Sequence, residues 1–457
     1  MHGSLSMLQA ALSAARITAD ARFDGVSTDS RDAAPGNLFV ALRGERFDAH
    51  DFLEQVAARD VAAVVVEHVP RGLTLPALIV PDTRMALGEI GNYWRRQFAI
   101  PLVAVTGSNG KTTVKEMLAS ILEAAFGADQ YLATRGNFNN EVGVPLTLLR
   151  LHPACRAAVV ELGMNHPGEI AGLAAIAQPT VGLVNNAQRE HQEFMASVEA
   201  VARENGAVIA HLPADGTAVF PADDEHSPLW RHYAAQAACN TLTFGLSTDA
   251  DVHCRYVAGK FGSELQVVAC GGEMAISLAA AGEHNVRNAL AAIACACAIG
   301  VDRGAIVRGL QSFAPVSGRL QRKLAPGGAT VIDDTYNANP DSVRAAIDVL
   351  ASTPAPRILV LGDMGEVGNE GRRYHEEVGT YAHARGIDQL HTLGELAAHA
   401  AQSFGSGAVH HPDLAALNDA LDARSQSNTT VLVKGSRFMK MERVVQHLLG
   451  QAHQELH

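Results

Sequence analysis

The residues that point most directly to chemistry form a glycine-rich turn followed by a lysine and two threonines. Backbone N–H groups in such a turn bind phosphate, the lysine reaches the β- and γ-phosphates, and the first threonine hydroxyl ligates Mg²⁺. The full pattern would place a further glycine at position 105, where Val105 stands, so this is a shortened variant. We therefore predict that the chain binds ATP and Mg²⁺ through Gly107, Ser108, Asn109, Gly110, Lys111, Thr112 and Thr113.

The elements around this turn must present it to a phosphate. An apolar run leads into the turn and predicts a strand at Leu102–Thr106. After the turn, a helical pattern extends from Lys111 to about Ala125. Glycines before a lysine could simply mark a turn, but the strand before and the helix after favour a phosphate-binding loop.

Two further sites could belong to a nucleotide pocket. Glu161 ends an apolar strand, where a parallel sheet would place a second Mg²⁺ contact beside Thr112, although a strand-terminal Glu is often only solvated. Asn285 and Asn288 lie one helical turn apart, so their amides could bind a purine edge. Asparagine at a helix start is more commonly a cap, and both interpretations stay open.

Composition narrows the class of protein. The 457 residues carry a formal net charge of −12 and contain no basic cluster that could follow a nucleic-acid backbone. We therefore expect no nucleic-acid binding. No apolar run reaches about 18 residues and no signal peptide is evident, so we expect no membrane insertion. The six cysteines show no metal spacing, which predicts reduced thiols in a cytoplasmic enzyme, with Cys295 and Cys297 as core residues. We interpret His410 and His411 as surface residues.

Strand and helix patterns divide the chain into three α/β domains, which we place at 1–99, 100–314 and 315–457. In the second and third domains apolar strands alternate with helical patterns, which predicts parallel sheets with crossover helices. The third domain is expected to be doubly wound and Rossmann-like, with ligands at the carboxyl ends of its strands. The expected strands are Leu38–Leu42, Ala62–Val66, Ala77–Val80, Leu102–Thr106, Ala157–Leu162, Val181–Asn185, Thr217–Phe220, Thr330–Asp334, Arg357–Gly362, Gln389–Leu393 and Val431–Lys434.

Several motifs occur together and resemble those of the Mur ligase family over essentially the whole chain. Besides the phosphate loop, they are Val26-Ser-Thr-Asp-Ser-Arg31, Gly36-Asn-Leu-Phe-Val-Ala-Leu42, Gly136-Asn-Phe-Asn-Asn-Glu-Val-Gly-Val-Pro145, Glu161-Leu-Gly163, Gly282-Glu-His-Asn-Val-Arg-Asn288, Gly318-Arg319, Asp333-Asp-Thr-Tyr-Asn-Ala-Asn-Pro340, Leu361-Gly-Asp-Met-Gly-Glu366 and Lys434-Gly-Ser-Arg437.

The resemblance implies an ATP- and Mg²⁺-dependent amide ligase of peptidoglycan precursor synthesis. More narrowly, it implies that D-alanyl-D-alanine is joined to UDP-N-acetylmuramoyl-tripeptide through an acyl phosphate. The implied architecture is a small N-terminal α/β UDP-binding domain, a central P-loop ATPase domain and a C-terminal Rossmann-like domain, in a protein that we expect to be a monomer.

Site residues follow from the resemblance position by position. Lys111, Glu161, His191 and Arg319 would be catalytic, with Thr112, Glu161 and His191 holding metal. Arg319 and Asp334 would close on the triphosphate and ribose, and Asn285 and Asn288 would bind the nucleotide. The uridine and diphosphate of the substrate would meet Ser27, Thr28, Asp29, Ser30 and Arg31, and the central cleft near the substrate would be lined by Asn137, Asn139 and Asn140. The incoming dipeptide would meet Asn337, Asn339, Lys434 and Ser436.

Two positions depart from the family pattern. Glu190 stands where the family has Ala, and Asn205 stands where it has a Lys that supports a second Mg²⁺. An amide oxygen is a weaker partner for a hard cation than an anionic oxygen. The alternative of solvent-facing Asn205 stays open.

Two other functions stay in view. Folylpolyglutamate synthase has a related plan, but the long first domain and Asp334-Thr-Tyr-Asn-Ala-Asn339 argue against it. A nucleotide switch or motor ATPase is the second, although the Asn-Lys-x-Asp base-reading motif of switch GTPases does not occur in the sequence.

Overall fold

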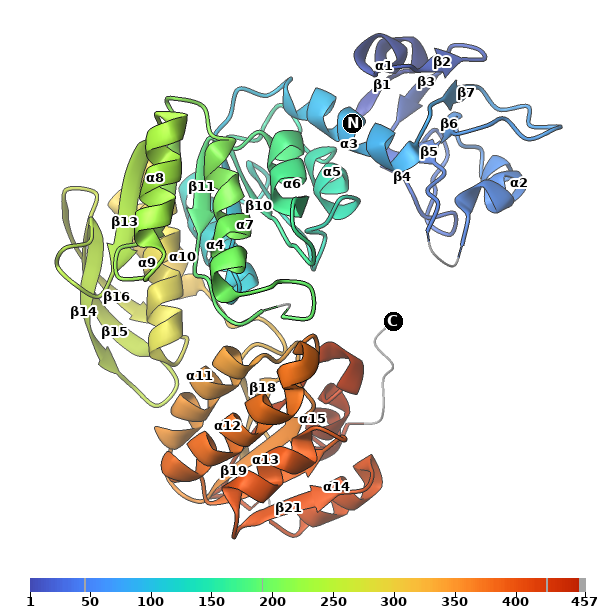
Figure 1. The fold of residues 1–457 in the computed structure, drawn as a ribbon. Helices are drawn as coiled ribbons and strands as arrows, with labels where there is room; N and C mark the ends of the chain where they lie inside the picture. The colour runs from blue at the N-terminus through green and yellow to red at the C-terminus, as the bar shows by residue number, and fades with distance from the viewer. Residues whose placement is uncertain (45–46, 191, 425, 452–457) are drawn as a thin grey trace.

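Three parts follow one another along the chain, each built around its own main β-sheet (Figure 1). The computed structural model describes residues 1–44, 47–190, 192–424 and 426–451. Mixed α/β architecture with parallel strands in all three parts confirms the predicted fold class.

The N-terminal part contains a five-stranded sheet in the order β2-β7-β6-β5-β4. Only the β2–β7 pairing is antiparallel, and β1 and β3 form a separate two-stranded sheet. Its strands are β1 (His2–Ser4), β2 (Arg16–Ile17), β3 (Arg22–Asp24), β4 (Val26–Ser27), β5 (Leu38–Val40), β6 (Ala63–Val66) and β7 (Ala77–Ile79). Its helices are α1 (Leu5–Ala11), the 3₁₀ helix η1 (Ala49–Phe52), α2 (Leu53–Ala57) and α3 (Thr83–Arg95).

The central part is a nine-stranded sheet in the order β16-β15-β14-β13-β12-β11-β8-β10-β9. Its strands are β8 (Leu102–Thr106), β9 (Tyr131–Ala133), β10 (Ala157–Glu161), β11 (Val181–Val184), β12 (Thr217–Pro221), β13 (Asn240–Gly245), β14 (Val252–Ala258), β15 (Ser263–Ala269) and β16 (Gly272–Leu278). Its helices are α4 (Lys111–Phe126), α5 (Gly143–Leu148), α6 (Glu169–Ala177), α7 (Val198–Ala210), α8 (Ser227–Ala237), α9 (Glu283–Ala298) and α10 (Arg303–Ser312).

The buried strand β8 shows why this sheet is covered on both faces. Leu102 and Ala104 pack into the core formed with α3, α5, α6 and α7, whereas Val103 and Val105 pack into the core formed with α4, α9 and α10. Because successive strand residues point to opposite faces, a strand that is apolar throughout requires helices on both sides. The β14–β15 and β15–β16 pairings at the edge of this sheet are antiparallel, which our expectation of parallel strands did not include.

The C-terminal part is a six-stranded sheet in the order β17-β18-β22-β19-β20-β21, in which only the edge strand β17 is antiparallel. Its strands are β17 (Gln321–Leu324), β18 (Thr330–Asp334), β19 (Arg357–Gly362), β20 (Gln389–Leu393), β21 (Ala408–His411) and β22 (Thr430–Lys434). The helices are α11 (Pro340–Ala351), η2 (Gly368–Glu370), α12 (Gly371–Ala384), α13 (Ala397–Phe404), α14 (Leu414–Asp422), η3 (Arg437–Met439) and α15 (Glu442–Leu448). Helices α11, α12 and α13 share one core, and α14 and α15 share the other, as in a doubly wound sheet.

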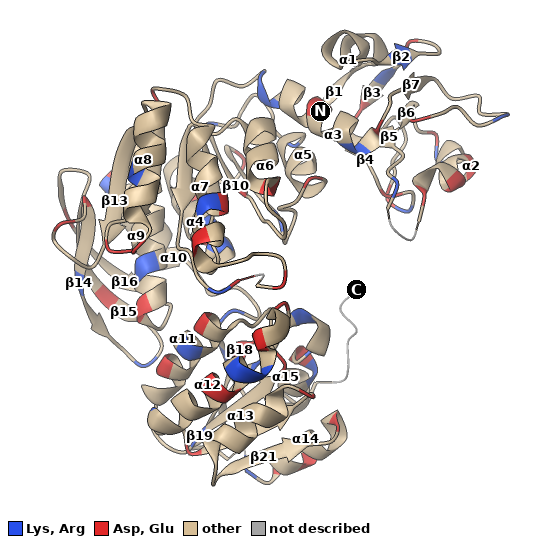
Figure 2. Cartoon of the chain, in the orientation of Figure 1, with Lys and Arg blue, Asp and Glu red and all other residues tan. Residues whose placement is uncertain are grey.

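The connections between the parts are short. Helix α3 ends at Arg95 before β8 begins at Leu102, and α10 ends at Ser312 before β17 begins at Gln321. Our domain boundaries fall within these two connections and remain predictions. Lys and Arg are interspersed with Asp and Glu over all three parts (Figure 2). No helix among the described residues combines the length and apolar character needed to cross a bilayer.

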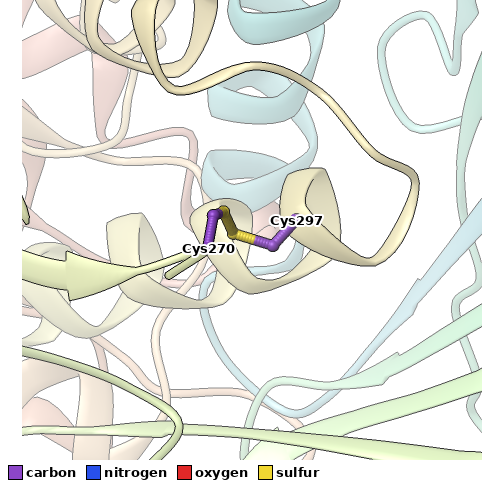
Figure 3. The surroundings of a disulfide bond; sticks show 2 residues. All are labelled: Cys270 and Cys297. Atoms are coloured by element: carbon purple, nitrogen blue, oxygen red, sulfur yellow. A yellow bond between two sulfur atoms is a disulfide. The ribbon is translucent and has the colours of Figure 1, made fainter. Parts of the chain in front are cut away.

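The cysteines correct one expectation. Cys270, at the turn between β15 and β16, forms a disulfide with Cys297 in the last turn of α9 (Figure 3), with their Cα atoms 5.6 Å apart. Cys297 is therefore neither a reduced thiol nor simple core packing, whereas Cys295 is a free, fully buried core residue as expected. The two bonded cysteines are 27 residues apart, and only the packing of the β15–β16 turn on α9 brings them together.

His411 corrects a second expectation. Its side chain is buried, and its Nε2 lies 2.9 Å from Nδ1 of the fully buried His391 on the neighbouring strand β20. His410 is exposed, as predicted.

Candidate functional site

The phosphate loop has the predicted strand–turn–helix form. Gly107 and Gly110 have φ angles of 131° and 82°, which a residue with a Cβ rarely adopts. Gly110 precedes the first residue of α4, so the loop ends where the unpaired N–H groups of the helix begin. This arrangement presents backbone donors and the positive end of a 16-residue helix to an anion.

The Lys111 ammonium lies within the turn. Its Nζ donates to the carbonyl oxygens of Gly107 (2.5 Å) and Ser108 (3.1 Å) and to Oε1 of Glu190 (2.9 Å). The Lys111 and Glu190 side chains are only 15% and 13% exposed. The positive charge is thus aimed into the loop, where a phosphate would be bound.

Thr112, Asn139 and Glu161 meet at the start of α4. The Thr112 hydroxyl donates to Oε2 of Glu161 at 2.9 Å, and Nδ2 of Asn139 donates to Oε1 at 2.9 Å. Glu161 is buried, and its backbone N–H donates to the hydroxyl of Thr134. Asn139, which we assigned to the substrate, therefore orients the carboxylate that we assigned to the metal.

These oxygen donors fit Mg²⁺. Mg²⁺ prefers hard oxygen ligands and is typically bound by one or two carboxylates, with phosphates and water completing its shell. A hydroxyl and a buried carboxylate already 2.9 Å apart provide that kind of protein contribution. Within the described residues there is no cluster of three or more His, Cys, Asp or Glu side chains able to hold a metal. His191, the other predicted metal ligand, lies outside the described residues.

A chain of buried amides joins α9 to the phosphate loop. Asn285 Nδ2 donates to the Ala281 carbonyl oxygen, and Asn288 Nδ2 donates to Asn285 Oδ1. Asn185 Nδ2, after β11, donates both to Asn288 Oδ1 (2.9 Å) and to the backbone oxygen of Asn109 (2.8 Å). Gly282 rather than an asparagine is the N-cap of α9, so the capping interpretation is wrong for this pair.

In the C-terminal part, Asp334 and Lys434 end the adjacent strands β18 and β22. Lys434 Nζ donates to Asp334 Oδ2 at 2.6 Å and to the Asn337 carbonyl oxygen at 2.9 Å. Arg319 stacks on the Tyr336 ring, with its Cζ 4.0 Å from the ring centroid. The Ser436 hydroxyl donates to the Ala338 carbonyl oxygen at 3.2 Å, so the predicted residues of this part lie around one end of the sheet.

Asn339 contacts the phosphate loop directly. Its Nδ2 donates to Oδ1 of Asn109 at 2.9 Å, across 230 positions of sequence. The same side chain caps α11, because Asn339 Oδ1 accepts from the backbone N–H of Ser342 at 2.8 Å. The motif from Asp333 to Pro340 thus places a helix start of the C-terminal part beside the loop of the central part.

The predicted substrate residues of the N-terminal part form a turn in which they hydrogen-bond to one another. Arg31 donates to Asp29 through its side chain and its backbone, which lowers the pKa of Asp29 to about 2. The Ser27 hydroxyl donates to the Asp29 carbonyl oxygen. Thr28 and Ser30 are half-buried in the same turn. In the central part, Asn140 accepts from the Gly143 N–H at 2.9 Å, whereas Asn137 is exposed.

Asn205 does not face solvent, so that alternative is wrong. It is 1% exposed, and its Oδ1 accepts the N–H of Gly107 at 2.8 Å. Its amide oxygen therefore holds the phosphate loop in place.

Sequence reasoning missed Asn185, Asn186, Gln188 and Arg189, which follow β11 and contact the loop or the C-terminal part. Asn186 Oδ1 accepts from the Asn109 N–H at 2.9 Å, and Gln188 Oε1 accepts from Asn109 Nδ2 at 2.6 Å. A run of amide side chains directly after a strand adjacent to the phosphate-loop strand was the available signal.

Comparisons with known proteins bear on all three parts. Residues 22–95 match the model described as Mur ligase family, catalytic domain; residues 105–296 match the Mur ligase middle domain; and residues 318–437 match the Mur ligase, glutamate ligase domain. The chain is 40% identical to UDP-N-acetylmuramoyl-tripeptide–D-alanyl-D-alanine ligase of Escherichia coli (strain K12), covering 97% of this chain and 98% of the relative. The enzyme of that name from Haemophilus influenzae is 39% identical, covering 93% of both chains.

Solved structures agree with these relatives. A crystal structure of MurF from Acinetobacter baumannii has a TM-score of 0.92 and 35% identity, covering 99% of both chains. MurF of Thermotoga maritima in complex with ADP has a TM-score of 0.83 and 26% identity, covering 93% of this chain and 97% of that one. Folylpolyglutamate synthase of Mycobacterium tuberculosis, at 18% identity and a TM-score of 0.65, shares the fold, covering 81% of this chain and 95% of that one. The three domain matches and the relatives identical at 39–40% over nearly the full length establish that this chain belongs to the Mur ligase family.

Proposed function

We propose that this chain is an ATP-dependent ligase that joins D-alanyl-D-alanine to UDP-N-acetylmuramoyl-tripeptide in peptidoglycan precursor synthesis. Relatives carrying that name are 39–40% identical over almost the whole chain, and the Thermotoga relative was solved with ADP. The observation that carries the proposal is the meeting of Lys111, Thr112 and Glu161 at the start of α4.

The reaction requires activation of a carboxylate, because a peptide carboxylate is a poor electrophile. The γ-phosphoryl group of ATP is transferred to that carboxylate, giving an acyl phosphate and ADP. The amine of D-alanyl-D-alanine then attacks the acyl carbon, phosphate leaves, and the nitrogen loses a proton as the amide forms.

The residues of the chain contribute mainly charge and position. Lys111 and the N–H groups at the start of α4 stabilise the negative charge on the transferred phosphoryl oxygens. Thr112 and Glu161 would hold Mg²⁺, which neutralises phosphate charge when bound. Asn139 and Thr134 fix the Glu161 carboxylate, so its orientation is set before substrate arrives.

The C-terminal part supplies the remaining assigned groups. We assign Arg319 and Asp334 to the triphosphate and ribose, and Asn337, Asn339, Lys434 and Ser436 to the incoming dipeptide. The contact of Asn339 with Asn109 supports this assignment, because it brings the dipeptide residues to the loop that would hold ATP. We assign Ser27, Thr28, Asp29, Ser30 and Arg31 to the UDP portion, and Asn137 and Asn140 to the cleft. We also propose a cytoplasmic monomer.

The test measures phosphate release from ATP with each peptide substrate omitted in turn. Release that requires both UDP-N-acetylmuramoyl-tripeptide and D-alanyl-D-alanine supports the ligase. Release without either substrate would instead indicate a switch or motor ATPase, and release with a folate and glutamate would indicate folylpolyglutamate synthase.

A further inference from the structure

The residues Gln188, Arg189 and Glu190, which follow β11, contact the phosphate loop on one side and the C-terminal part on the other. At the loop end, the three hydrogen bonds of Lys111 to Gly107, Ser108 and Glu190 account for all three protons of the ammonium group. A phosphate oxygen that binds Lys111 must therefore replace one of these acceptors. Glu190 is the acceptor on a side chain, and it carries the negative charge that a phosphate would repel.

At the other end, Arg189 binds two acidic residues of the C-terminal part. Its Nη2 donates to Asp341 Oδ1 at 2.6 Å and its Nη1 to Glu377 Oε2 at 2.7 Å. Its backbone N–H donates to Asp341 Oδ2 at 3.0 Å, so main chain and side chain are both held. Asp341 lies in the first turn of α11, and Glu377 lies in α12.

This Arg189 contact is stronger than an ordinary surface pair. The side chains of Arg189, Asp341 and Glu377 are only 21%, 24% and 29% exposed. The hydrogen bonds from Arg189, followed by those from Arg344, hold the pKa of Glu377 at about 2. Partly buried, charge-assisted forks of this kind hold geometry more firmly than exposed pairs.

The two ends are mechanically linked because Arg189 and Glu190 are consecutive. Consecutive Cα atoms are 3.8 Å apart and share a rigid peptide unit. Moving the Glu190 carboxylate away from Lys111 by rotation of its backbone changes the direction of the Arg189 main chain, which itself binds Asp341.

We propose that Arg189 and Glu190 are positioning residues that couple nucleotide binding at Lys111 to the placement of the C-terminal part. The terminal phosphate of a nucleoside triphosphate displaces Glu190 from Lys111, and the displacement is transmitted through Arg189 to Asp341 and Glu377. Linkage requires the reverse effect as well, so the Arg189 contacts alter the affinity for nucleotide. This inference rests on the proposed function only in taking the loop as a nucleotide site.

The first experiment measures the affinity of the full-length protein for a non-hydrolysable ATP analogue by calorimetry, with and without Mg²⁺. Glu190→Gln keeps the shape of the side chain but removes the competing charge, so we expect about fivefold tighter binding, which corresponds to ~1 kcal/mol. The KM for ATP should fall accordingly. Glu193→Gln, an exposed carboxylate in the same loop, is the matched control and should bind like wild type. Unchanged or weaker binding by Glu190→Gln, including weaker binding only with Mg²⁺, would overturn the proposal.

The second experiment follows hydrogen exchange in α11 and α12. The analogue should change exchange in the first turn of α11, which holds Asp341, and around Glu377 in the middle of α12 in wild type. This response should be lost in Arg189→Ala although the analogue still binds. Arg344→Gln is the matched control, because it removes another cation from Glu377 without altering the 188–190 segment, and it should keep the response. An identical response in wild type and Arg189→Ala would overturn the coupling.

The two proposals can fail separately. If the wild-type protein ligates its substrates but Glu190→Gln does not bind the ATP analogue more tightly, only the coupling is refuted. A wild-type protein that binds the analogue and responds in α11, yet forms no amide, refutes only the proposed reaction.

Discussion

Individual residues of the site are held by neighbours before any substrate arrives. Glu161 receives hydrogen bonds from Thr112 and Asn139, and Asn205 holds the Gly107 N–H. Pre-arranged polar groups do not need to reorganise during the reaction, which is the main source of electrostatic catalysis. The amide side chains near the loop therefore fix the loop and the Glu161 carboxylate, in addition to the ligand contacts that we propose.

Lys111→Ala tests the charge at the loop. Loss of about 3 kcal/mol of charge stabilisation should reduce turnover about a hundredfold at saturating MgATP, while circular dichroism and the unfolding midpoint stay close to wild type. Arg203→Ala, which removes an exposed cation on α7, serves as the control and should retain full activity. Retention of more than a third of wild-type turnover by Lys111→Ala would place the chemistry elsewhere.

At the scale of elements, strands β20 and β21 bring two imidazoles together inside the C-terminal sheet. Burial, and then the neighbouring His411, lowers the pKa of His391 to about 4, and burial also lowers the pKa of His411. Both rings are therefore neutral in the folded protein near pH 7, where one can donate to the other.

The His391 pKa makes folding sensitive to acid. An unfolded histidine titrates near pH 6.5, so the unfolded chain binds the extra proton first and stability falls between pH 6.5 and about 4. Between pH 7.5 and pH 5.0 this one group should lower the free energy of unfolding by about 2 kcal/mol. The loss should appear in urea titrations as a lower midpoint of the transition that includes the C-terminal part. His391→Phe should flatten the dependence of stability on pH. His410→Gln, which replaces an exposed histidine of the neighbouring strand, should leave that dependence unchanged. Parallel pH profiles for wild type and His391→Phe would contradict the assignment.

Sequence patterns predicted the regular elements well where the signal is local. The strands Leu102–Thr106, Thr330–Asp334, Arg357–Gly362 and Gln389–Leu393 have the predicted limits, because an apolar run between turn residues defines a buried parallel strand. The antiparallel strands β15 and β16 were missed, although the alternation of buried and exposed residues in Ser263–Leu278 is typical of half-buried strands.

Contacts between distant segments could not be read from patterns in the same way. The Asn109–Asn339 bond spans 230 positions, and the Arg189–Asp341 pair spans 152. The Cys270–Cys297 disulfide likewise depends on how a hairpin turn packs on α9. Thr112 and Glu161 were predictable as neighbours because Thr112 lies just after β8 and Glu161 ends the adjacent parallel strand β10, at the same edge of the sheet.

At the scale of the whole molecule, the site that we propose combines residues of two parts with separate sheets. The loop and Glu161 belong to the central sheet, whereas Arg319, Asp334 and Lys434 belong to the C-terminal part. Exclusion of water from a reactive acyl phosphate requires these parts to close around it.

Closure should be visible by small-angle X-ray scattering. We expect a smaller radius of gyration when the ATP analogue and UDP-N-acetylmuramoyl-tripeptide bind together than when the protein is free. Arg319→Ala, which removes a cation from the C-terminal part, should weaken both this compaction and productive use of ATP. Identical profiles for free and fully liganded protein would argue against a moving C-terminal part.

Transfer of ¹⁸O from substrate to phosphate tests the central claim most directly. UDP-N-acetylmuramoyl-tripeptide labelled with ¹⁸O in its terminal carboxylate is incubated with ATP, Mg²⁺ and D-alanyl-D-alanine, and the released phosphate is analysed by mass spectrometry. If the carboxylate is phosphorylated and the dipeptide amine then displaces phosphate, each phosphate released carries one oxygen from the labelled carboxylate. Amide formation accompanied by unlabelled phosphate would contradict the acyl-phosphate mechanism.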